Sequence, residues 1–259
     1  MTIADFTTNE MMTVAAARML KNGTVCFVGI GLPSQAANLA RLTHAPEVVL
    51  IYESGPIGTK PDVLPLSIGD GVLADTADTV VPTHEIFRYW LQGGHIDVGF
   101  LGGAQIDRFG NINTTVIGDY NNPKVRLPGA GGAPEIADQA GEVFVVMRQG
   151  PRSFVEKIDF LTSAGYLDGG DAREKLGIEG KGPTRVITDL CILEPEQGSQ
   201  EFVVTSIHHG ISREQISAAT GWGIRFANEV IETAAPTQEE LSTLRALLAR
   251  TAEAHQKNK

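Results

Sequence analysis

The sequence of 259 residues has few cysteines and no long apolar run. Cys26 and Cys191 both lie in apolar stretches, which predicts two reduced core thiols and favours the cytoplasm. No window reaches the roughly 18 consecutive apolar residues that a membrane-spanning helix needs. Met1–Glu10 lacks the basic and apolar blocks of a secretory signal. The net charge of -10 disfavours nucleic acid and anionic membranes as partners, because both repel a negatively charged chain.

Several motifs of common enzyme classes are also absent. The sequence has no Gly-x-Ser-x-Gly nucleophile elbow and no phosphate-binding Gly-Lys-Ser loop. His44, His84 and His95 have no metal-ligand spacing to cysteine or to each other. His208 and His209 are adjacent, so a strand directs them to opposite faces and they cannot bind one metal. We therefore predict no metal site.

The order of the expected elements predicts an α/β fold. Thr7 and Glu10 have the spacing of a capping box, which begins a helix over residues 8–21. A buried strand over 24–29, a helix over 33–42 and a strand over 48–52 then form a βαβ unit. Later apolar patterns predict strands over 97–101, 143–147, 186–190 and 202–207, and helices over 83–92, 212–220 and 237–250. We predict one domain over residues 1–259, with a single open, mainly parallel sheet and helices on both faces.

An acidic residue directly follows one of these strands. Glu53 ends the run Val48–Tyr52, and Ser54, Gly55, Pro56 and Gly58 come after it. Open α/β sheets bind their ligands at the carboxyl ends of the strands. A carboxylate fixed in such a loop serves as a nucleophile, a base or a metal ligand, whereas a plain solvated loop is the structural alternative.

Two glycine-rich segments are candidate anion-binding sites. Gly29-Ile-Gly31-Leu-Pro33 joins a strand to a helix, where free backbone N–H groups receive phosphate or carboxylate oxygens. It is not a dinucleotide fingerprint, because Ser34 replaces the third glycine. Gly129-Ala-Gly-Gly-Ala133 directs several N–H groups toward one point, which suits an oxyanion. A tight turn without a ligand is the alternative for the first segment, and a solvated strand is the alternative for Lys124 and Arg126 nearby.

These segments resemble the β subunits of family I CoA transferases. Glu53-Ser54-Gly55 is similar to the Glu-Ser-Gly or Glu-Asn-Gly signature of that family. Its further landmarks follow in the same order, at residues 29–33, 102–107, 110–113, 117–120, 129–133, 157–159 and 186–189. The resemblance extends to about Gly221, and several blocks in register are more specific than any one of them.

The resemblance implies a mechanism and a set of site residues. Glu53 is expected to attack the thioester of an acyl-CoA donor and to carry CoA as a glutamyl thioester. Coenzyme A is then a substrate and covalent intermediate, and no permanently bound cofactor is expected. The expected oxyanion, CoA or substrate contacts are Gly29, Gly31, Ser54, Gly55, Gly129, Gly131, Gly132 and Ala133.

The resemblance also implies substrates and a partner. Succinyl-CoA is the expected donor and 3-oxoadipate, a dicarboxylic acid of aromatic degradation, the expected acceptor. The family's α subunit carries a Val-Gly-Gly-Phe-Gly type segment that this chain lacks, so we expect an α subunit as partner in a hetero-oligomer. Phe87, Tyr89 and Trp90 share one expected helix and are candidates for the core or for that subunit interface.

Four other functions stay open. A glutaconate CoA-transferase subunit shares the same landmarks, and a CoA-thioester or C–C hydrolase on the same scaffold uses water in place of the acceptor acid. The missing third glycine and acidic ribose partner disfavour a Rossmann-type oxidoreductase. If the chain is instead a non-catalytic interaction subunit, Glu53 has no catalytic role.

Overall fold

The computed structural model describes residues 5–257, so the remaining residues of the predicted domain, 1–4 and 258–259, lie outside it. The chain divides into two compact units, Met1–Phe100 with Ala235–Lys259, and Leu101–Ala234. We describe each unit by itself. That residues 1–259 form one domain stays a prediction.

The sheet of the first unit has a parallel centre. Strand β1 (Val25–Phe27) lies between β2 (Val49–Ile51) and β5 (Val98–Leu101) and runs parallel to both. Strands β3 (Pro56–Ile57) and β4 (Thr79–Val80) continue the sheet beyond β2 with antiparallel pairing. The central strands are almost wholly buried, as their continuous apolar sequences predict for parallel strands covered on both faces. The predicted βαβ unit is confirmed.

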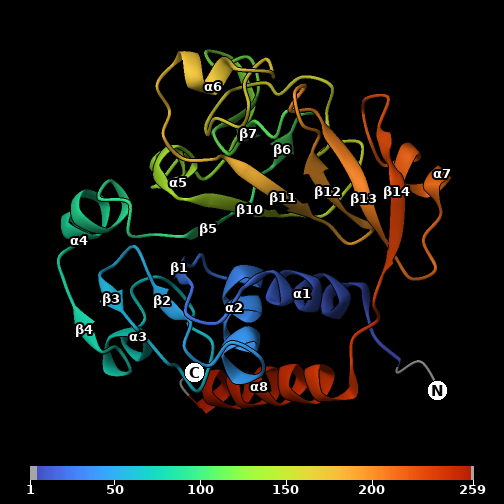
Figure 1. The fold of residues 1–259 in the computed structure, drawn as a ribbon. Helices are drawn as coiled ribbons and strands as arrows, with labels where there is room; N and C mark the ends of the chain where they lie inside the picture. The colour runs from blue at the N-terminus through green and yellow to red at the C-terminus, as the bar shows by residue number, and fades with distance from the viewer. Residues whose placement is uncertain (1–4, 258–259) are drawn as a thin grey trace. The chain divides into compact units, whose positions relative to one another are not determined.

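Three helices of the first unit pack together. They are α1 (Thr8–Met19), α2 (Leu32–Leu42) and α8 (Gln238–Lys257), and Figure 1 shows α8 beside the other two although it comes from the opposite end of the chain. Helix α1 begins with the predicted capping box, in which the Thr7 hydroxyl accepts from the Glu10 N–H and the Glu10 carboxylate accepts from the Thr7 N–H.

The predicted helix over residues 83–92 has two parts. It starts as α4 (Thr83–Glu85) and continues as the π-helix η1 (Ile86–Leu91), in which Gln92 N–H donates to the Phe87 carbonyl at 2.9 Å. Phe87 packs against Phe27 with 5.9 Å between ring centroids, whereas Tyr89 is 61% exposed. The same segment thus supplies both a core contact and an exposed aromatic ring.

The second unit contains a mixed sheet. Strands β10 (Glu142–Val146) and β11 (Pro183–Ile187) are parallel, β12 (Cys191–Pro195) is antiparallel to both of its neighbours, and β13 (Phe202–His208) pairs in parallel with the edge strand β14 (Arg225–Thr233). Together with the parallel centre of the first unit, these pairings confirm the α/β class and the mainly parallel sheet.

Small elements fill the glycine-rich segment over residues 102–133. It forms two hairpins, β6 (Gln105–Ile106) with β7 (Ile112–Asn113), and β8 (Val116–Gly118) with β9 (Pro123–Arg126). The remaining short helices are α3 (Gly71–Asp75), α5 (Ala133–Gln139), α6 (Ala172–Lys175) and α7 (Arg213–Ala218). Within residues 5–257, every helix is too short or too polar to cross a membrane.

Candidate active site

Two of the predicted segments leave the same edge of the first unit's sheet. Phe27 at the end of β1 pairs with Ile51 at the end of β2, and the N–H of Val28 donates to the Ile51 carbonyl at 2.8 Å. Because the strands are parallel, the turns that follow them, Gly29–Gly31 and Glu53–Gly55, begin side by side. The sequence therefore placed Glu53 correctly at the carboxyl edge of the sheet.

Glu53 and Ser54 form the centre of a tight turn. The N–H of Gly55 donates to the Tyr52 carbonyl at 3.0 Å, and the N–H of Tyr52 donates to the Pro56 carbonyl at 3.1 Å. Gly55 has a φ of 120°, and a Cβ at this position would overlap the carbonyl oxygen of Val81. Glycine is therefore required here by the backbone of Val81. Because residues 52–55 carry the predicted nucleophile Glu53, we call them the catalytic turn.

The Glu53 side chain is half-buried, and its carboxylate is free of hydrogen-bond donors from the described residues of the first unit. Within the part of the first unit that the structure describes, no side chain or backbone group donates a hydrogen bond to it. The adjacent Ser54 hydroxyl donates to the carbonyl of Ile68. A carboxylate without a donor keeps its oxygen lone pairs available for attack on an electrophile.

A buried hydrogen bond lies beneath the catalytic turn. The side chain of Tyr52 is fully buried and its hydroxyl lies 2.8 Å from the Ser34 hydroxyl on α2. Burial raises the pKa of Tyr52 to about 12, so its hydroxyl is neutral at pH 7. The Asn38 amide donates to the Ser34 carbonyl at 2.9 Å. This contact was not predicted from the sequence, although the polar residues Ser34 and Asn38, one turn apart on a mostly apolar helix, were a signal.

The Gly29–Gly31 segment forms the amino terminus of α2. Gly31 has a φ of 85° and is the N-cap residue, without a side-chain cap, and Pro33 lies in the first helical turn. A Cβ at Gly29 would approach only Pro33, at 3.8 Å, and a Cβ at Gly31 would contact nothing within 4 Å. This helix terminus therefore has open space around it, as an anion-binding terminus needs.

The Gly129–Ala133 segment belongs to the second unit and leads into α5, which begins at Ala133. The N–H of Gly129 donates to the Thr114 carbonyl at 2.9 Å, and that of Ala133 to the Ala130 carbonyl at 3.1 Å. In the described part of this unit, the N–H groups of Gly131 and Gly132 have no acceptor. Of the four predicted positions, these two are thus the ones with free donors.

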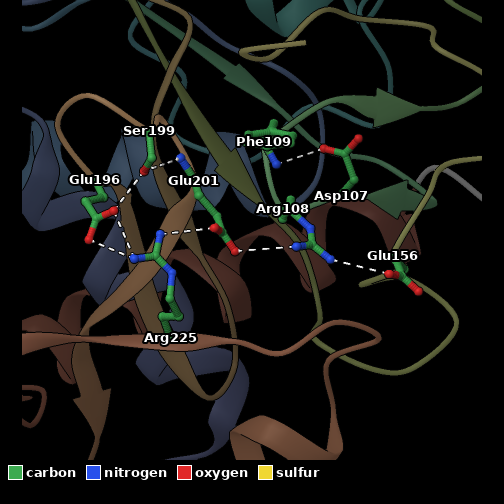
Figure 2. Close-up of polar contacts among 8 residues, drawn as sticks. All are labelled: Asp107, Arg108, Phe109, Glu156, Glu196, Ser199, Glu201 and Arg225. Atoms are coloured by element: carbon green, nitrogen blue, oxygen red, sulfur yellow. Dashed lines mark hydrogen bonds and ion pairs between the residues drawn. The ribbon is translucent and has the colours of Figure 1, made fainter. Parts of the chain in front are cut away.

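Other landmark residues have structural roles. The Asp107 carboxylate accepts from the N–H of Phe109 at 2.9 Å (Figure 2). It also accepts from the N–H and the side-chain amide of Asn111. Burial raises the pKa of Asp107, while these bonds oppose the rise. The Asn111 side chain also accepts from the N–H groups of Gly165 and Leu167. Asp107 and Asn111 therefore hold the surrounding loops in place.

Charged side chains near Asp107 are already paired. Figure 2 shows Arg108 between Glu156, at 3.5 Å, and Glu201, at 3.9 Å, while Arg225 binds Glu201 at 3.0 Å. A pocket of about 1060 Å³ in this unit is lined mainly by residues 107–109 and 156–161. Because Arg108 is held between two carboxylates, it offers little net charge to an anionic ligand.

The cysteines and histidines behave as predicted. Cys26 and Cys191 are buried free thiols, and burial raises the pKa of Cys191 to about 12. His208 is buried between Thr188 and Thr233, and burial lowers its pKa, whereas His209 is exposed on the opposite face and contacts Glu232. No three metal-ligating side chains cluster anywhere in residues 5–257.

The chain belongs to the coenzyme A transferase family. The family model described as Coenzyme A transferase matches residues 9–219, which covers the two turns of the first unit and the glycine segment before α5. The protein is therefore a CoA-transferase, with CoA as a substrate, and the predicted family is confirmed.

Two relatives extend the likeness over nearly the whole chain. One subunit of the 3-oxoadipate CoA-transferase of Pseudomonas knackmussii is 74% identical over 250 residues, which cover 96% of each chain. One subunit of the glutaconate CoA-transferase of Acidaminococcus fermentans is 35% identical over 247 residues, 93% of this chain and 92% of the relative. The crystal structure of that glutaconate enzyme gives a TM-score of 0.88 and covers 94% of this chain and 95% of the matched chain, at 34% identity.

A protein whose subunit is named as a cholesterol ring-cleaving hydrolase shares the fold. The structure of IpdAB from Rhodococcus jostii gives a TM-score of 0.76 at 22% identity and covers 93% of this chain and 94% of the matched chain. At this identity the likeness shows the fold alone. The scaffold is thus common to proteins with different activities, and the site residues decide the chemistry.

Proposed function

We propose that this chain is the glutamate-bearing subunit of a 3-oxoadipate CoA-transferase that takes CoA from succinyl-CoA. The observation that carries the proposal is the open Glu53 carboxylate in a tight turn at the carboxyl edge of a parallel sheet. The identity of 74% to a chain of 3-oxoadipate CoA-transferase, over 96% of both chains, supports the substrate.

The proposed chemistry is nucleophilic and proceeds through two adducts. The Glu53 carboxylate attacks the thioester carbonyl of succinyl-CoA, and CoA thiolate leaves as a mixed anhydride forms. The thiolate then attacks the glutamyl carbonyl, which releases succinate and leaves CoA on Glu53 as a thioester. 3-Oxoadipate repeats the steps in reverse and departs as 3-oxoadipyl-CoA. A carboxylate suits both adducts because each is reactive enough to pass CoA onward.

Backbone donors are proposed to assist the tetrahedral steps. We retain the predicted contacts of CoA, of the substrate or of an oxyanion, which are Gly29, Gly31, Ser54, Gly55, Gly129, Gly131, Gly132 and Ala133. Gly131 and Gly132 fit an oxyanion best because their N–H groups have no acceptor within the described second unit. Each such donor contributes about 3 kcal/mol to transition-state stabilisation.

We further propose that the chain acts with an α subunit in the cytoplasm. The two relatives above are both named as one subunit of their enzyme. The absent Val-Gly-Gly-Phe-Gly type segment supports a partner that completes the CoA site. No permanently bound cofactor takes part in the proposed steps.

Glutaconate transfer is the second candidate, supported by a TM-score of 0.88 to glutaconate CoA-transferase. A panel of dicarboxylates and monocarboxylates, offered to the assembled enzyme with succinyl-CoA or acetyl-CoA, separates the two candidates. We expect the highest kcat/KM with 3-oxoadipate. Equal efficiency with a monocarboxylate of the same length would contradict a dicarboxylate site.

Glu53 variants test the mechanism itself. We expect Glu53→Ala to abolish transfer, and Glu53→Asp to lose transfer while slow thioester hydrolysis remains, because the shorter side chain withdraws the carboxylate from the carbonyl. Borohydride should inactivate wild-type enzyme only in the presence of an acyl-CoA, since only the thioester adduct is reducible. Glu239→Ala, an exposed acid on α8, is the control and should retain full activity. Near-normal transfer by Glu53→Ala, or no CoA adduct on Glu53 by mass spectrometry, sinks the proposal.

A further inference from the structure

The hydroxyl of Ser54 connects the catalytic turn to a separate loop. Ser54 follows Glu53 directly, and its hydroxyl donates to the carbonyl of Ile68. We call residues 61–70 the supporting loop. A hydroxyl has one proton, so while Ser54 donates to Ile68 it cannot also donate to a substrate oxyanion.

The tip of the supporting loop is held by its own hydrogen bonds. The Asp70 carboxylate accepts from the N–H of Leu66 at 2.9 Å and from that of Val72 at 3.2 Å. The N–H of Asp70 donates to the Ser67 carbonyl at 3.1 Å. These bonds close the chain on both sides of Ile68, so the Ile68 carbonyl is a fixed acceptor.

The other end of the supporting loop is fastened to two helices. The Thr251 hydroxyl on α8 accepts from the N–H of Leu64 at 2.9 Å and donates to the Leu247 carbonyl at 2.8 Å. Thr251 and Leu64 are 8% and 7% exposed, so the bond is shielded from water. On α2, the Arg41 guanidinium donates to the Pro61 carbonyl at 2.8 Å.

Glu53 has no comparable support of its own. Its carboxylate lacks a donor within the described first unit, so its position depends on the backbone of the catalytic turn. Nucleophilic attack tolerates little displacement of the attacking atom, and a misplacement of about 1 Å costs up to ~100-fold in rate. A contact that fixes the residue next to Glu53 therefore bears directly on the rate.

We propose that Ser54 is a positioning residue that couples the catalytic turn to the supporting loop, and through it to α8, so that the Glu53 carboxylate is held for attack. The inference rests on the proposed role of Glu53 as the nucleophile.

The first test replaces Ser54 in the assembled αβ enzyme. We expect Ser54→Ala to lower kcat on the order of 10- to 100-fold with little change in KM, because substrate binding is retained and the attack geometry is lost. Ser54→Asn and Ser54→Thr keep a donor and should restore most of the kcat. A wild-type kcat for Ser54→Ala, or a raised KM with unchanged kcat, overturns the inference.

The second test uses the far end of the same loop. Thr251→Val removes the acceptor of the Leu64 N–H and should lower kcat, whereas Thr251→Ser retains it and should not. Ser54→Ala with Thr251→Val should be no slower than Ser54→Ala alone, since both act through one loop. Ser242→Ala is the control, because the Ser242 hydroxyl donates to the Glu239 carbonyl within α8. The effects of Ser242→Ala and Ser54→Ala on kcat should be independent of each other. Fully multiplicative effects of Ser54→Ala and Thr251→Val contradict the coupling.

Two further measurements distinguish a failure of the positioning role of Ser54 from a failure of the proposed role of Glu53. Thermal unfolding of each variant shows whether a lower kcat reflects a lost fold, and we expect Ser54→Ala to unfold within a few degrees of wild type. If Glu53→Ala is inactive and Ser54→Ala is normal, only the positioning role fails. If Glu53→Ala stays active, the proposed function itself fails.

Discussion

Gly31 and Gly55 both have backbone conformations that favour glycine, but their surroundings differ. The φ angles are 85° and 120°. A Cβ on Gly31 would contact nothing within 4 Å, whereas a Cβ on Gly55 would overlap the Val81 carbonyl oxygen. An alanine at Gly31 therefore measures the free-energy cost of the backbone conformation alone, whereas an alanine at Gly55 adds the cost of a steric overlap.

We expect Gly55→Ala to disrupt the catalytic turn and Gly31→Ala to leave the fold in place. The first forces β4 away from the turn, so transfer activity should be lost together with more than about 2 kcal/mol of stability. The second meets no neighbouring atom and adds only the strain of alanine at φ 85° and ψ -127°, which lies outside the left-handed helical region and costs about 1–3 kcal/mol. Urea unfolding of both variants measures the difference. Equal destabilisation would show that the space beside Gly55 can open at no cost.

The sequence predicted residue positions better than residue contacts. Glu53 lies at the predicted edge because an apolar strand ends there. The bonds of Ser54 to Ile68 and of Tyr52 to Ser34 join residues 14 and 18 positions apart, and depend on how loop and helix pack on the sheet. No local pattern encodes such partners. Local turn chemistry does not reveal the collision partner of Gly55 either.

Elements with a two-sided apolar or a capped pattern were predicted well. The capping box of α1, Pro33 in the first turn of α2, and the buried strands β1 and β2 all follow from local sequence. The edge strand β14 was missed because most of its side chains are exposed, which leaves no apolar period to detect. The π-helix was expected as part of an ordinary helix, since the two types differ in hydrogen bonding rather than in residue pattern.

The contact between α1 and α8 gives an expected pH dependence. The Arg245 guanidinium binds Glu10 at 2.6 Å and, against the effect of burial, lowers the pKa of Glu10 to about 2 from an ordinary value of 4.5. Because the folded-state pKa is the lower one, this pair stabilises the fold above about pH 4.5. Its contribution is lost as the pH falls from about 4.5 to about 2.

We therefore expect Arg245→Ala to be less stable than wild type at pH 7, and the difference to shrink progressively below pH 4.5. Urea midpoints of wild type and variant between pH 2.5 and 7 measure the difference. Lys21→Ala is the control, because it removes an exposed positive charge that has no carboxylate partner among residues 5–257. A difference for Arg245→Ala that stays constant down to pH 2.5 would exclude Glu10 as the cause.

At the scale of the molecule, the first unit leaves large apolar side chains exposed. Leu66 and Tyr89 are 66% and 61% exposed, and Val80 is 54% exposed. Isolated exposed apolar residues are ordinary, but here they accompany a chain whose family relatives are named as subunits. Leu66, Val80 and Tyr89 are therefore the residues at which to test the prediction that an α partner covers apolar surface of this chain.

We expect the chain alone to be inactive and full turnover to appear when the α subunit is added. The reason is that the chain lacks the glycine-rich CoA segment of the α subunit. Titration of one purified chain with the other, followed by a transfer assay, gives the stoichiometry at saturation. Full turnover by this chain without a partner would refute the two-subunit proposal.

The first unit is assembled from two separated stretches of sequence, and this affects its synthesis. Helix α8 packs on α1 and α2 and anchors the supporting loop, but residues 101–234 are translated before it. At a ribosomal rate of about 5–20 residues per second, the amino-terminal stretch waits roughly 7 to 27 seconds for that helix. During this interval the α8-facing sides of α1 and α2 are open to chaperones and to other nascent chains. On the proposed coupling, Glu53 thus gains the support of α8 only after residues 101–234 have been translated.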